Sequence, residues 1–271
     1  MNNIPDILKK IVETKKTEVL GFAKDIQRIK EEAAAQQPPL DFRKAIYSKL
    51  KENTIIAEVK KASPSVGIIS MCFNAAAIAR EYEKGGANAI SVLTDKEYFK
   101  GDSLYLREVK KNTVIPVLRK DFIIAPEQII ETRAIGADSF LLISSILSTV
   151  QLSEFILMGR ELSMEPLVEI HNENDLENAI EADAGIIGIN NRNLHNFTVN
   201  TDTAIRLIPL IPSNKVIVAE SGISSLKTAS QLYNAGADSL LIGEYLMKSE
   251  NKASMIHQIK NCCKNKQKGN S

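Results

Sequence analysis

The chain contains no tryptophan and only three cysteines and three histidines among its 271 residues. Two of the cysteines, Cys262 and Cys263, are adjacent, and no Cys-x-x-Cys pair is present, which excludes a disulfide framework and the common zinc patterns. The histidines show no metal-ligand spacing. The sequence therefore predicts a protein without a metal site.

An excess of charge of one sign and long apolar runs are also missing. With 34 basic and 33 acidic residues, the formal net charge is +1, which gives no electrostatic reason for binding nucleic acid or an acidic membrane. No run is long enough to cross a bilayer, and no secretory signal opens the chain. We therefore expect a soluble, cytoplasmic protein without nucleic-acid or membrane partners.

From Thr54 onward, short apolar runs of strand character alternate with helical stretches. The predicted strands are Ile55–Val59, Ala89–Leu93, Val114–Leu118, Ser139–Ile143, Pro166–Ile170, Gly185–Ile189, Val216–Ala219 and Ser239–Ile242. The clearest helices between them are Ala75–Lys84, Pro126–Ile135, Leu152–Leu162 and Leu226–Ala235. Eight βα units without an antiparallel element favour an α/β fold closed as a single (βα)8 barrel, with a doubly wound open sheet as the alternative.

A short repeat supports this reading. Gly86-Ala87-Asn88, Gly136-Ala137-Asp138 and Gly236-Ala237-Asp238 each follow a helix and precede an apolar strand, and residues 181–185 form a weaker copy. The glycine is expected to end the helix in a left-handed conformation, and the Asn or Asp to start the turn.

Two helical segments precede the first strand. Residues 5–30 have an apolar stripe at helical spacing and predict one amphipathic helix, whereas residues 42–50 predict a short second helix after the break at Pro38-Pro39. We therefore divide the chain into a helical extension (1–53), a barrel (54–260) and a basic tail (261–271), which we interpret as a solvated end.

The first strand ends in two charges that share a face. Glu58 and Lys60 are two residues apart and therefore point the same way from a strand. A buried acid and amine are costly to desolvate unless they pair or take part in chemistry. The residues thus indicate either a functional site or a strand end whose charges reach water.

Other predicted strands also end in polar residues. These are Lys120, Glu169, Asn190, Glu220 and Glu244. Catalytic groups of barrels lie at the carboxyl ends of strands, and two lysines with two glutamates fit proton transfer on an organic substrate. Burial is expected to lower the lysine pKa values and to raise the glutamate pKa values. Arg119, Asp121 and Arg192 are interpreted by default as structural ion pairs.

The last two strands indicate a phosphate site. Ser221-Gly222 and Gly243-Glu244 each place a glycine just past a strand, where the backbone can approach a ligand and a helix start can offer N–H groups to an anion. Barrel phosphate sites form at these two loops. Tight turns without a ligand are the alternative.

Several motifs together resemble one enzyme family. They are Glu58-Val59-Lys60-x-x-Ser63-Pro64-Ser65, Leu93-Thr94-Asp95, Tyr98-Phe99-x-Gly101, Lys120-Asp121-Phe122, Glu165-Pro166-Leu167-Val168-Glu169, Gly188-Ile189-Asn190-Asn191-Arg192-x-Leu194, Ala219-Glu220-Ser221-Gly222-Ile223 and Leu241-Ile242-Gly243. In order and spacing, from about Ile7 to Met247, they are similar to those of indole-3-glycerol phosphate synthase.

The resemblance implies a (βα)8 enzyme of tryptophan biosynthesis without cofactor or metal. It would convert 1-(2-carboxyphenylamino)-1-deoxyribulose 5-phosphate into indole-3-glycerol phosphate, carbon dioxide and water, as a monomer or weak homo-oligomer. Lys120 would be the general acid at the ribulose carbonyl, and Lys60 would hold the carboxylate. Glu58 and Glu169 would carry the later proton transfers, in an order that the residues leave open.

The remaining roles are likewise implied by the resemblance. Asn190 and Ser221 would orient substrate hydroxyls with support from Glu220, and Arg192 would contact the substrate. The residues expected to bind the phosphate are Ser63, Gly222, Gly243 and the backbone N–H of Glu244. Those expected to line the slot for the aromatic ring are Phe99, Phe122 and Leu142 or its neighbour Leu141.

Glu244 departs from family members that have serine at this position. Its carboxylate would repel a phosphate and is therefore expected to point away. Two other functions remain open from the residues: an aldolase that forms a Schiff base on Lys120, and a phosphate-binding barrel that serves as a scaffold.

Overall fold

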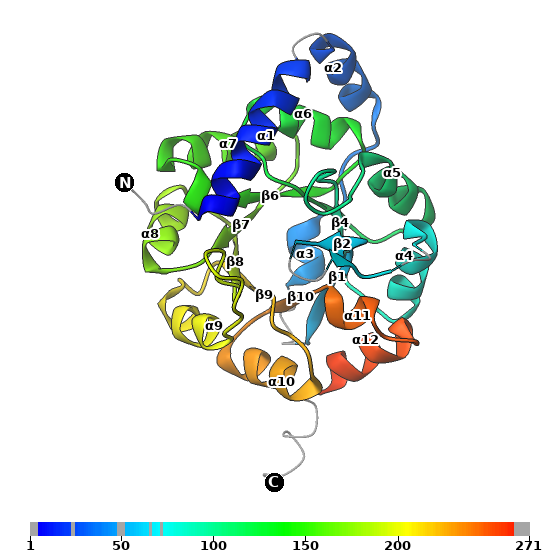
Figure 1. Ribbon diagram of the computed structural model, residues 1–271, viewed down its shortest axis with the longest axis vertical. Coiled ribbons are helices and arrows are strands. Elements are labelled where there is room, and N and C mark those ends of the chain that lie inside the picture. The colour runs from blue at the N-terminus through cyan, green and yellow to red at the C-terminus, as the bar shows by residue number, and fades with distance from the viewer. Residues whose placement is uncertain (1–4, 23–24, 48–51, 65–66, 71–72, 263–271) are drawn as a thin grey trace.

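A computed structural model describes residues 5–22, 25–47, 52–64, 67–70 and 73–262. Within these ranges, eight parallel strands close into a barrel, and helices form a ring around it (Figure 1). The barrel strands are β1 (Thr54–Val59), β4 (Ala89–Leu93), β5 (Val117–Lys120), β6 (Ser139–Ile143), β7 (Leu167–Ile170), β8 (Ile186–Asn190), β9 (Val216–Glu220) and β10 (Ser239–Ile242). The closure of β1 onto β10 confirms the predicted (βα)8 barrel and excludes the open sheet.

The outer helices follow their strands in chain order. They are α4 (Ala75–Lys84), α5 (Ser103–Asn112), α6 (Pro126–Ala134), α7 (Thr149–Glu161), α8 (Glu173–Glu181), α9 (Asp202–Leu207), α10 (Leu226–Ala235), α11 (Glu244–Met247) and α12 (Lys252–Asn261). Two short 3₁₀ helices, Ser144–Ile146 and Ile208–Leu210, complete the ring. A hairpin of β2 (Ala62–Ser63) and β3 (Gly67–Ile68) follows β1. Residues 263–271 of the predicted tail lie outside the described residues, and residue 261 ends α12.

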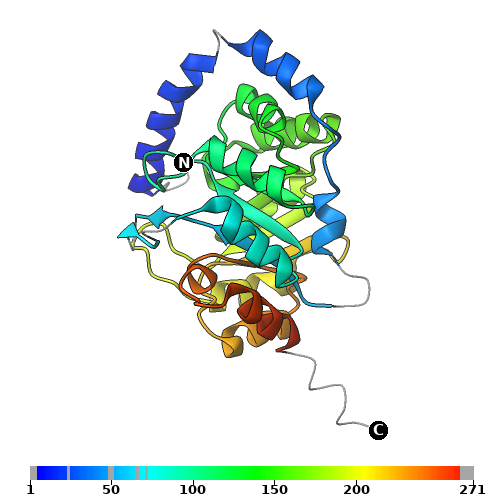
Figure 2. The same cartoon turned by 90° about the vertical axis from the view of Figure 1, so that its right-hand side faces the viewer.

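Of the three helices before β1, the first and the third lie at opposite ends of the barrel. Figure 2 shows α1 (Asp6–Phe22) on the same side as the β2–β3 hairpin, and α3 (Phe42–Ile46) on the other side. Between them, α2 (Ile26–Ala35) packs against α6. The prediction of one helix over residues 5–30 was wrong, because α1 ends at Phe22 and α2 begins at Ile26.

The three repeated Gly-Ala-Asn/Asp turns join α4 to β4, α6 to β6 and α10 to β10. The glycines have φ of 86°, 88° and 116°, which confirms the predicted left-handed conformation. The Asn or Asp that follows accepts the N–H of the first or second residue of the preceding strand, as Asp138 does from Val117 and Asp238 does from Ile217. These carboxylates therefore tie neighbouring strands together at the amino end of the barrel.

The third barrel strand begins later than predicted. Val114 is exposed and Pro116 has no N–H to donate, so β5 runs from Val117 to Lys120 instead of over residues 114–118. The shift matters for the site because it places Lys120 inside the strand, directly beside Leu93 of β4 in the parallel register.

Alternation along each strand separates two apolar clusters. Side chains such as Ile56, Leu118 and Leu167 fill the barrel interior together with Phe42 and Ile46 of α3. The other face packs against the outer helices. Glu58, Lys120, Glu169 and Glu220 continue the interior rows by period two, so their side chains meet at the carboxyl end of the barrel.

Candidate active site

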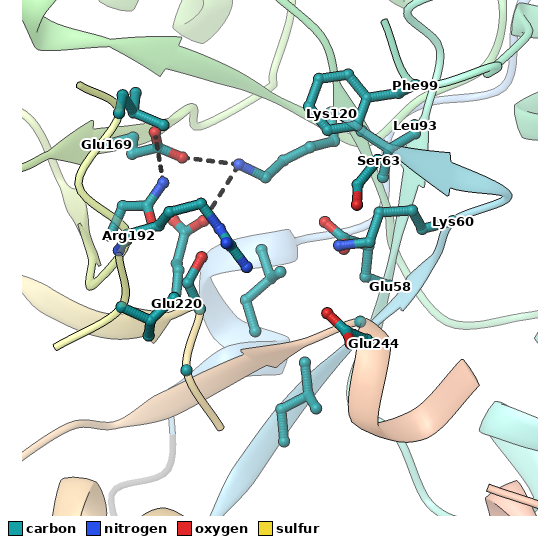
Figure 3. A pocket seen from close by; sticks show the side chains of 18 of the residues that line it. Glu58, Lys60, Ser63, Leu93, Phe99, Lys120, Glu169, Arg192, Glu220 and Glu244 are labelled. Carbon is teal, nitrogen blue, oxygen red and sulfur yellow. Dashed lines mark hydrogen bonds and ion pairs between the residues drawn. The ribbon is translucent and has the colours of Figure 1, made fainter. Parts of the chain in front are cut away.

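A cavity of about 780 Å³ opens at the carboxyl ends of the strands. Its walls come from the strand ends, the β2–β3 hairpin and α1, and Figure 3 shows the charged side chains that gather in it. The following sequence-predicted site residues all line it: Glu58, Lys60, Ser63, Phe99, Lys120, Phe122, Glu169, Asn190, Arg192, Glu220, Ser221, Gly222, Gly243 and Glu244.

Leu142 is the exception among the predicted residues. It is fully buried in the cluster between β6 and the outer helices, whereas its neighbour Leu141 belongs to the interior row and lines the cavity. Because side chains alternate along a strand, only one of the two can face the barrel axis. The apolar slot therefore contains Leu141, and the choice of Leu142 was wrong.

Lys120 is the electrostatic centre of the cavity. Its Nζ lies 2.7 Å from Glu169 Oε2 and 3.2 Å from Glu220 Oε2, so one ammonium on β5 bridges carboxylates from β7 and β9 (Figure 3). Asn190 on β8 donates from Nδ2 to Glu169 Oε1 at 3.1 Å. Four strands thus hold one hydrogen-bonded group in place.

The pKa values in this group differ from what burial alone predicts. Burial opposes the charged form of Lys120, but the Glu169, Glu220 and Glu58 charges outweigh it and raise the lysine pKa. Burial likewise opposes ionisation of Glu169, yet Lys120 and His171 lower the pKa of this carboxyl to about 2. The expected directions for Lys120 and Glu169 were therefore wrong.

Glu220 is the carboxyl whose pKa moves upward. Burial raises the pKa of Glu220 to about 7, because the attraction of Lys120 is offset by repulsion from Glu169 and Glu58. Its Oε1 is buried and has no hydrogen-bond partner among the described residues. Sequence reasoning gave Glu220 only a supporting role, since its distance to Lys120 depends on barrel closure.

Glu58 and Lys60 form a second pair on the opposite side of the cavity. Lys60 Nζ donates to Glu58 Oε2 at 2.5 Å. Gly243 lies directly beneath them: a Cβ at this position would stand 2.1 Å from Glu58 Oε2 and 2.9 Å from Lys60 Nζ. A methyl group added at Gly243 would therefore displace the ends of the Glu58 and Lys60 side chains.

The predicted phosphate-binding residues Ser63, Gly222, Gly243 and Glu244 all line the cavity. Ser221 and Gly222 follow β9 with φ of 60° and 77°, a conformation that is uncommon for serine and marks a strained turn. The short helix α11 begins at Glu244, directly after Gly243. The Glu244 carboxylate accepts a hydrogen bond from Lys248 Nζ at 2.6 Å, so it is neutralised on its own helix.

The apolar part of the cavity lies between two aromatic rings and α1. The rings of Phe99 and Phe122 have centroids 6.0 Å apart. Asp95 holds the first of them in place, because its Oδ1 accepts the backbone N–H groups of Tyr98 and Phe99. From α1, Ile7, Leu8 and Ile11 line the same cavity, so this helix covers part of the site.

A buried lysine attaches α1 to the barrel, and sequence reasoning missed it. Lys15 is 2% exposed, and its Nζ lies 3.0 Å from both Asp95 Oδ2 and Asp121 Oδ1. The spacing of the residues could have indicated that Lys15 is buried. Lys15 follows Leu8 by seven residues and Ile11 by four, and it therefore lies on the apolar face of the helix.

The three ambiguous charges have different roles. Arg119 points outward to α6 and pairs with Asp121 and Glu131, which confirms the structural interpretation for Arg119 and Asp121. Arg192 forms no ion pair with any residue that the structure describes. It lines the cavity and donates to the carbonyl oxygen of Phe197 at 3.2 Å, so the ion-pair interpretation of Arg192 was wrong.

The part of the chain that the structure describes contains no group of three or more His, Cys, Asp or Glu side chains that could hold a metal ion. No helix in the same residues is long and apolar enough to cross a membrane.

The sequence was matched to a protein family and to known relatives over most of its length. The family model described as "Indole-3-glycerol phosphate synthase" matches residues 8–259. The chain belongs to this family. It is 45% identical to the indole-3-glycerol phosphate synthase of Ruminiclostridium cellulolyticum over 94% of the chain and 98% of that protein, and 48% identical to that of Campylobacter jejuni over 82% and 86%.

Solved structures with similar folds are much more distant in sequence. 3-Hexulose-6-phosphate synthase from Salmonella typhimurium has a TM-score of 0.63 at 13% identity, covering 78% of this chain and 99% of that one. KGPDC from Streptococcus mutans has a TM-score of 0.62 at 11% identity, covering 79% and 98%. These likenesses show the barrel fold alone.

Membership of the indole-3-glycerol phosphate synthase family settles the reaction class. The chain is a decarboxylating lyase of tryptophan biosynthesis and acts on a phosphorylated small molecule.

Proposed function

We propose that Lys120 starts ring closure of 1-(2-carboxyphenylamino)-1-deoxyribulose 5-phosphate as the general acid. As the ring carbon that bears the carboxylate attacks the ribulose carbonyl carbon, Lys120 gives a proton to the carbonyl oxygen. General acid catalysis of this kind typically contributes ~10²–10⁴-fold in rate. The observation that carries the proposal is the double ion pair of Lys120 with Glu169 and Glu220, which keeps the ammonium charged and fixed in position.

Lys60 holds the substrate carboxylate in this proposal until it leaves as carbon dioxide. Its ammonium lies on the side of the cavity away from Lys120, beside Glu58. A positive charge there neutralises the carboxylate without a metal ion. The short contact between Lys60 Nζ and Glu58 Oε2 also keeps a proton available for the departing hydroxyl group.

Glu169 accepts the proton that is released when the new ring becomes aromatic. A carboxyl whose pKa is held at about 2 is ionised at neutral pH and can accept but not donate a proton. Glu58, with its proton shared from Lys60, then assists the departure of water. This assigns the base role to Glu169 and the acid role to Glu58.

The substrate lies across the cavity from the phosphate end to the aromatic slot. Its phosphate binds Ser63, Gly222, Gly243 and the backbone N–H of Glu244, and Arg192 contributes a positive charge. Asn190 and Ser221 orient the hydroxyl groups, with Glu220 behind them. The ring packs between Phe99, Phe122 and Leu141. The position of the loops after β9 and β10, together with the short helix α11, is typical of phosphate sites in barrels.

Replacing Lys120 with Ala tests the proposal, with exposed Lys111→Ala on α5 as the matched control. Formation of indole-3-glycerol phosphate is followed by its fluorescence, and folding by circular dichroism. We expect the Lys120 variant to fold and to lose turnover, while the Lys111 variant keeps it. Near-normal activity of the Lys120 variant would refute the assignment.

Two alternatives predict different outcomes. A Schiff-base aldolase needs a neutral lysine as nucleophile, whereas the carboxylates around Lys120 favour its charged form. Trapping of substrate on Lys120 by borohydride would support that enzyme. A scaffold barrel would bind phosphate ligands tightly and form no indole product.

We also propose a cytoplasmic protein that acts as a monomer or weak homo-oligomer, with residues 1–53 as an extension of the 54–260 barrel. Light scattering of the purified chain measures the oligomeric state.

A further inference from the structure

Gly188 lies in β8, two residues before Asn190, and therefore on the same inward face of the strand. It is buried, and in the parallel register it stands between Glu169 of β7 and Val218 of β9. Asn190 lines the active-site cavity. Gly188 is thus one inward position deeper in the barrel, below the cavity, where it can affect the site without touching a ligand.

The Glu220 carboxylate occupies the space that a side chain at position 188 would need. A Cβ added to Gly188 would stand 2.2 Å from Glu220 Oε1, whereas ordinary van der Waals contact begins at 3.4 Å. The next neighbour, Leu167 Cδ1, would be 3.1 Å away. Glu220 Oε1 is buried and accepts no hydrogen bond from any residue that the structure describes. Its place against β8 therefore depends on the space that the glycine leaves.

The other oxygen of Glu220 takes part in the central ion pair. Oε2 lies 3.2 Å from Lys120 Nζ, at the upper end of the range for a hydrogen bond (Figure 3). A carboxylate is rigid, so Oε2 moves whenever Oε1 moves. To reach 3.4 Å from a Cβ now placed at 2.2 Å, Oε1 would have to shift by about 1 Å. A shift of this size is enough to break the contact between Glu220 and Lys120.

We propose that Gly188 is a positioning residue of this enzyme, because the missing side chain lets the Glu220 carboxylate lie back against β8 while it stays paired with Lys120. A Cβ at position 188 would push the carboxylate toward the cavity, since the barrel interior below is filled by apolar side chains such as Leu167. In the cavity it would meet the ribulose hydroxyl groups and leave Lys120 with one carboxylate instead of two. This inference rests on the function proposed above.

Gly188→Ala tests the proposal, with Gly185→Ala as the matched control. Gly185 directly precedes the same strand at its amino end, away from the cavity. A Cβ there would also stand 2.2 Å from a carboxylate oxygen, Glu165 Oε1, to which Arg160 donates at 2.9 Å. Both variants should fold, because the atom that must move is the far end of a flexible side chain. We expect kcat to fall roughly 10- to 100-fold in the Gly188 variant, and to stay within about twofold of wild type in the Gly185 variant.

Shortening Glu220 separates a positioning role from a general effect on the fold. Asp is one methylene shorter than Glu, so in Glu220→Asp the carboxylate no longer reaches over Gly188. This substitution by itself should lower kcat, because the pair with Lys120 is stretched. Adding Gly188→Ala to it should then lower kcat by less than about twofold more, since the two positions no longer contact each other. If the glycine acted through Leu167 or through the strand itself, the full loss would appear in both backgrounds.

A crystal structure of the Gly188→Ala variant measures the displacement without any turnover. We expect the distance between Lys120 Nζ and Glu220 Oε2 to exceed the hydrogen-bond range of about 3.2 Å. If the Glu220→Asp variant has no activity, this structure decides. If Gly188→Ala does not fold, Glu220→Asp should restore its folding, and a double variant that also fails to fold would overturn the proposal.

Four other results would overturn it. They are an unchanged contact between Lys120 and Glu220 in the crystal structure, a wild-type kcat in the Gly188 variant, an equal loss in the Gly185 variant, and an equal loss from Gly188→Ala in the Glu220 and Asp backgrounds. A wild type that forms no product would instead refute the proposed function, and the displacement of Glu220 in the crystal structure would still test the role of Gly188.

Discussion

Replacing Lys15 with Met removes the buried ammonium that attaches α1 to the barrel. Removing one partner of a buried ion pair costs ~3–5 kcal/mol, because the charge that remains is uncompensated. The lower end of this range applies to Lys15, because both of its acidic partners keep other interactions. Asp121 keeps its pair with Arg119, and Asp95 keeps two backbone N–H donors. We therefore expect a loss of about 3 kcal/mol.

This loss is comparable to the lower end of what the apolar contacts of α1 contribute. Leu8 and Ile11 are 1% and 2% exposed, and burying such a side chain contributes ~1.5–3 kcal/mol. The two together therefore contribute ~3–6 kcal/mol, and the loss caused by the substitution offsets at least about half of this. Since these side chains line the active-site cavity, α1 should detach in many molecules and KM should rise about tenfold or more, as a loss of 1.4 kcal/mol in binding implies.

The assay is urea unfolding followed by circular dichroism, together with KM for the substrate. Lys16→Met is the control, because Lys16 is exposed and pairs with exposed Glu13, a contact worth ~0.2–1 kcal/mol. If the Lys15 and Lys16 variants have the same free energy of unfolding and the same KM, the attachment by Lys15 is refuted.

The pH dependence of stability gives a second check on the same contact. Burial would raise the pKa of Asp121, but Arg119 and Lys15 lower it from 3.8 to about 2, so its stabilisation is present above pH 3.8 and is lost as the pH falls toward 2. For Lys15, burial is outweighed by Asp121 and Asp95, and the raised pKa means that its stabilisation is lost only above pH 10.5. The difference between wild type and the Lys15 variant should therefore shrink at both extremes.

Three further substitutions test other parts of the site and fold. Glu220→Gln should stabilise the protein relative to wild type at pH 8 but not at pH 4. The pKa of this carboxyl rises from 4.5 to about 7 on folding, so its ionisation above about pH 7 destabilises the folded wild type. Thermal unfolding measures this, and an equal change in melting temperature at both pH values would contradict it. Gly243→Ala should lower kcat by up to ~10²-fold, because the added Cβ displaces the Glu58 and Lys60 side chains. An unchanged kcat would show that catalysis does not depend on the positions of these two side chains. Asp138→Ala should cost at least ~2 kcal/mol in urea unfolding, since the N–H groups of Leu40 and Val117 lose their acceptor, and a loss below 0.5 kcal/mol would exclude this role.

Local periodicity accounts for what could be predicted about the site. Glu58 and Lys60 share a face because a strand has a period of two, and the same rule places Leu118 and Lys120 together. Residues at strand ends meet because the carboxyl ends of all parallel strands lie on one side of a barrel. Both arguments need only the order of residues, so they could be made without coordinates.

Contacts between distant elements could not be predicted in this way. The pairs of Lys120 with Glu169 and Glu220 join residues 49 and 100 positions apart, and the attachment of Lys15 to Asp121 spans 106. The directions of the Lys120 and Glu169 pKa values were misjudged for this reason. Desolvation follows from burial alone, whereas the opposing charges depend on which strands become neighbours.

The sequence by itself determined the alternation of strands and helices, the inward direction of the charged side chains and the family to which the chain is similar. Only the tertiary structure decided that Leu141 and not Leu142 faces the cavity, that α1 covers the site, and that His171 lies against Glu169. The physical reason is that propensity and periodicity act over a few residues along the chain, whereas distances and electrostatic interactions across the barrel exist only after it has closed.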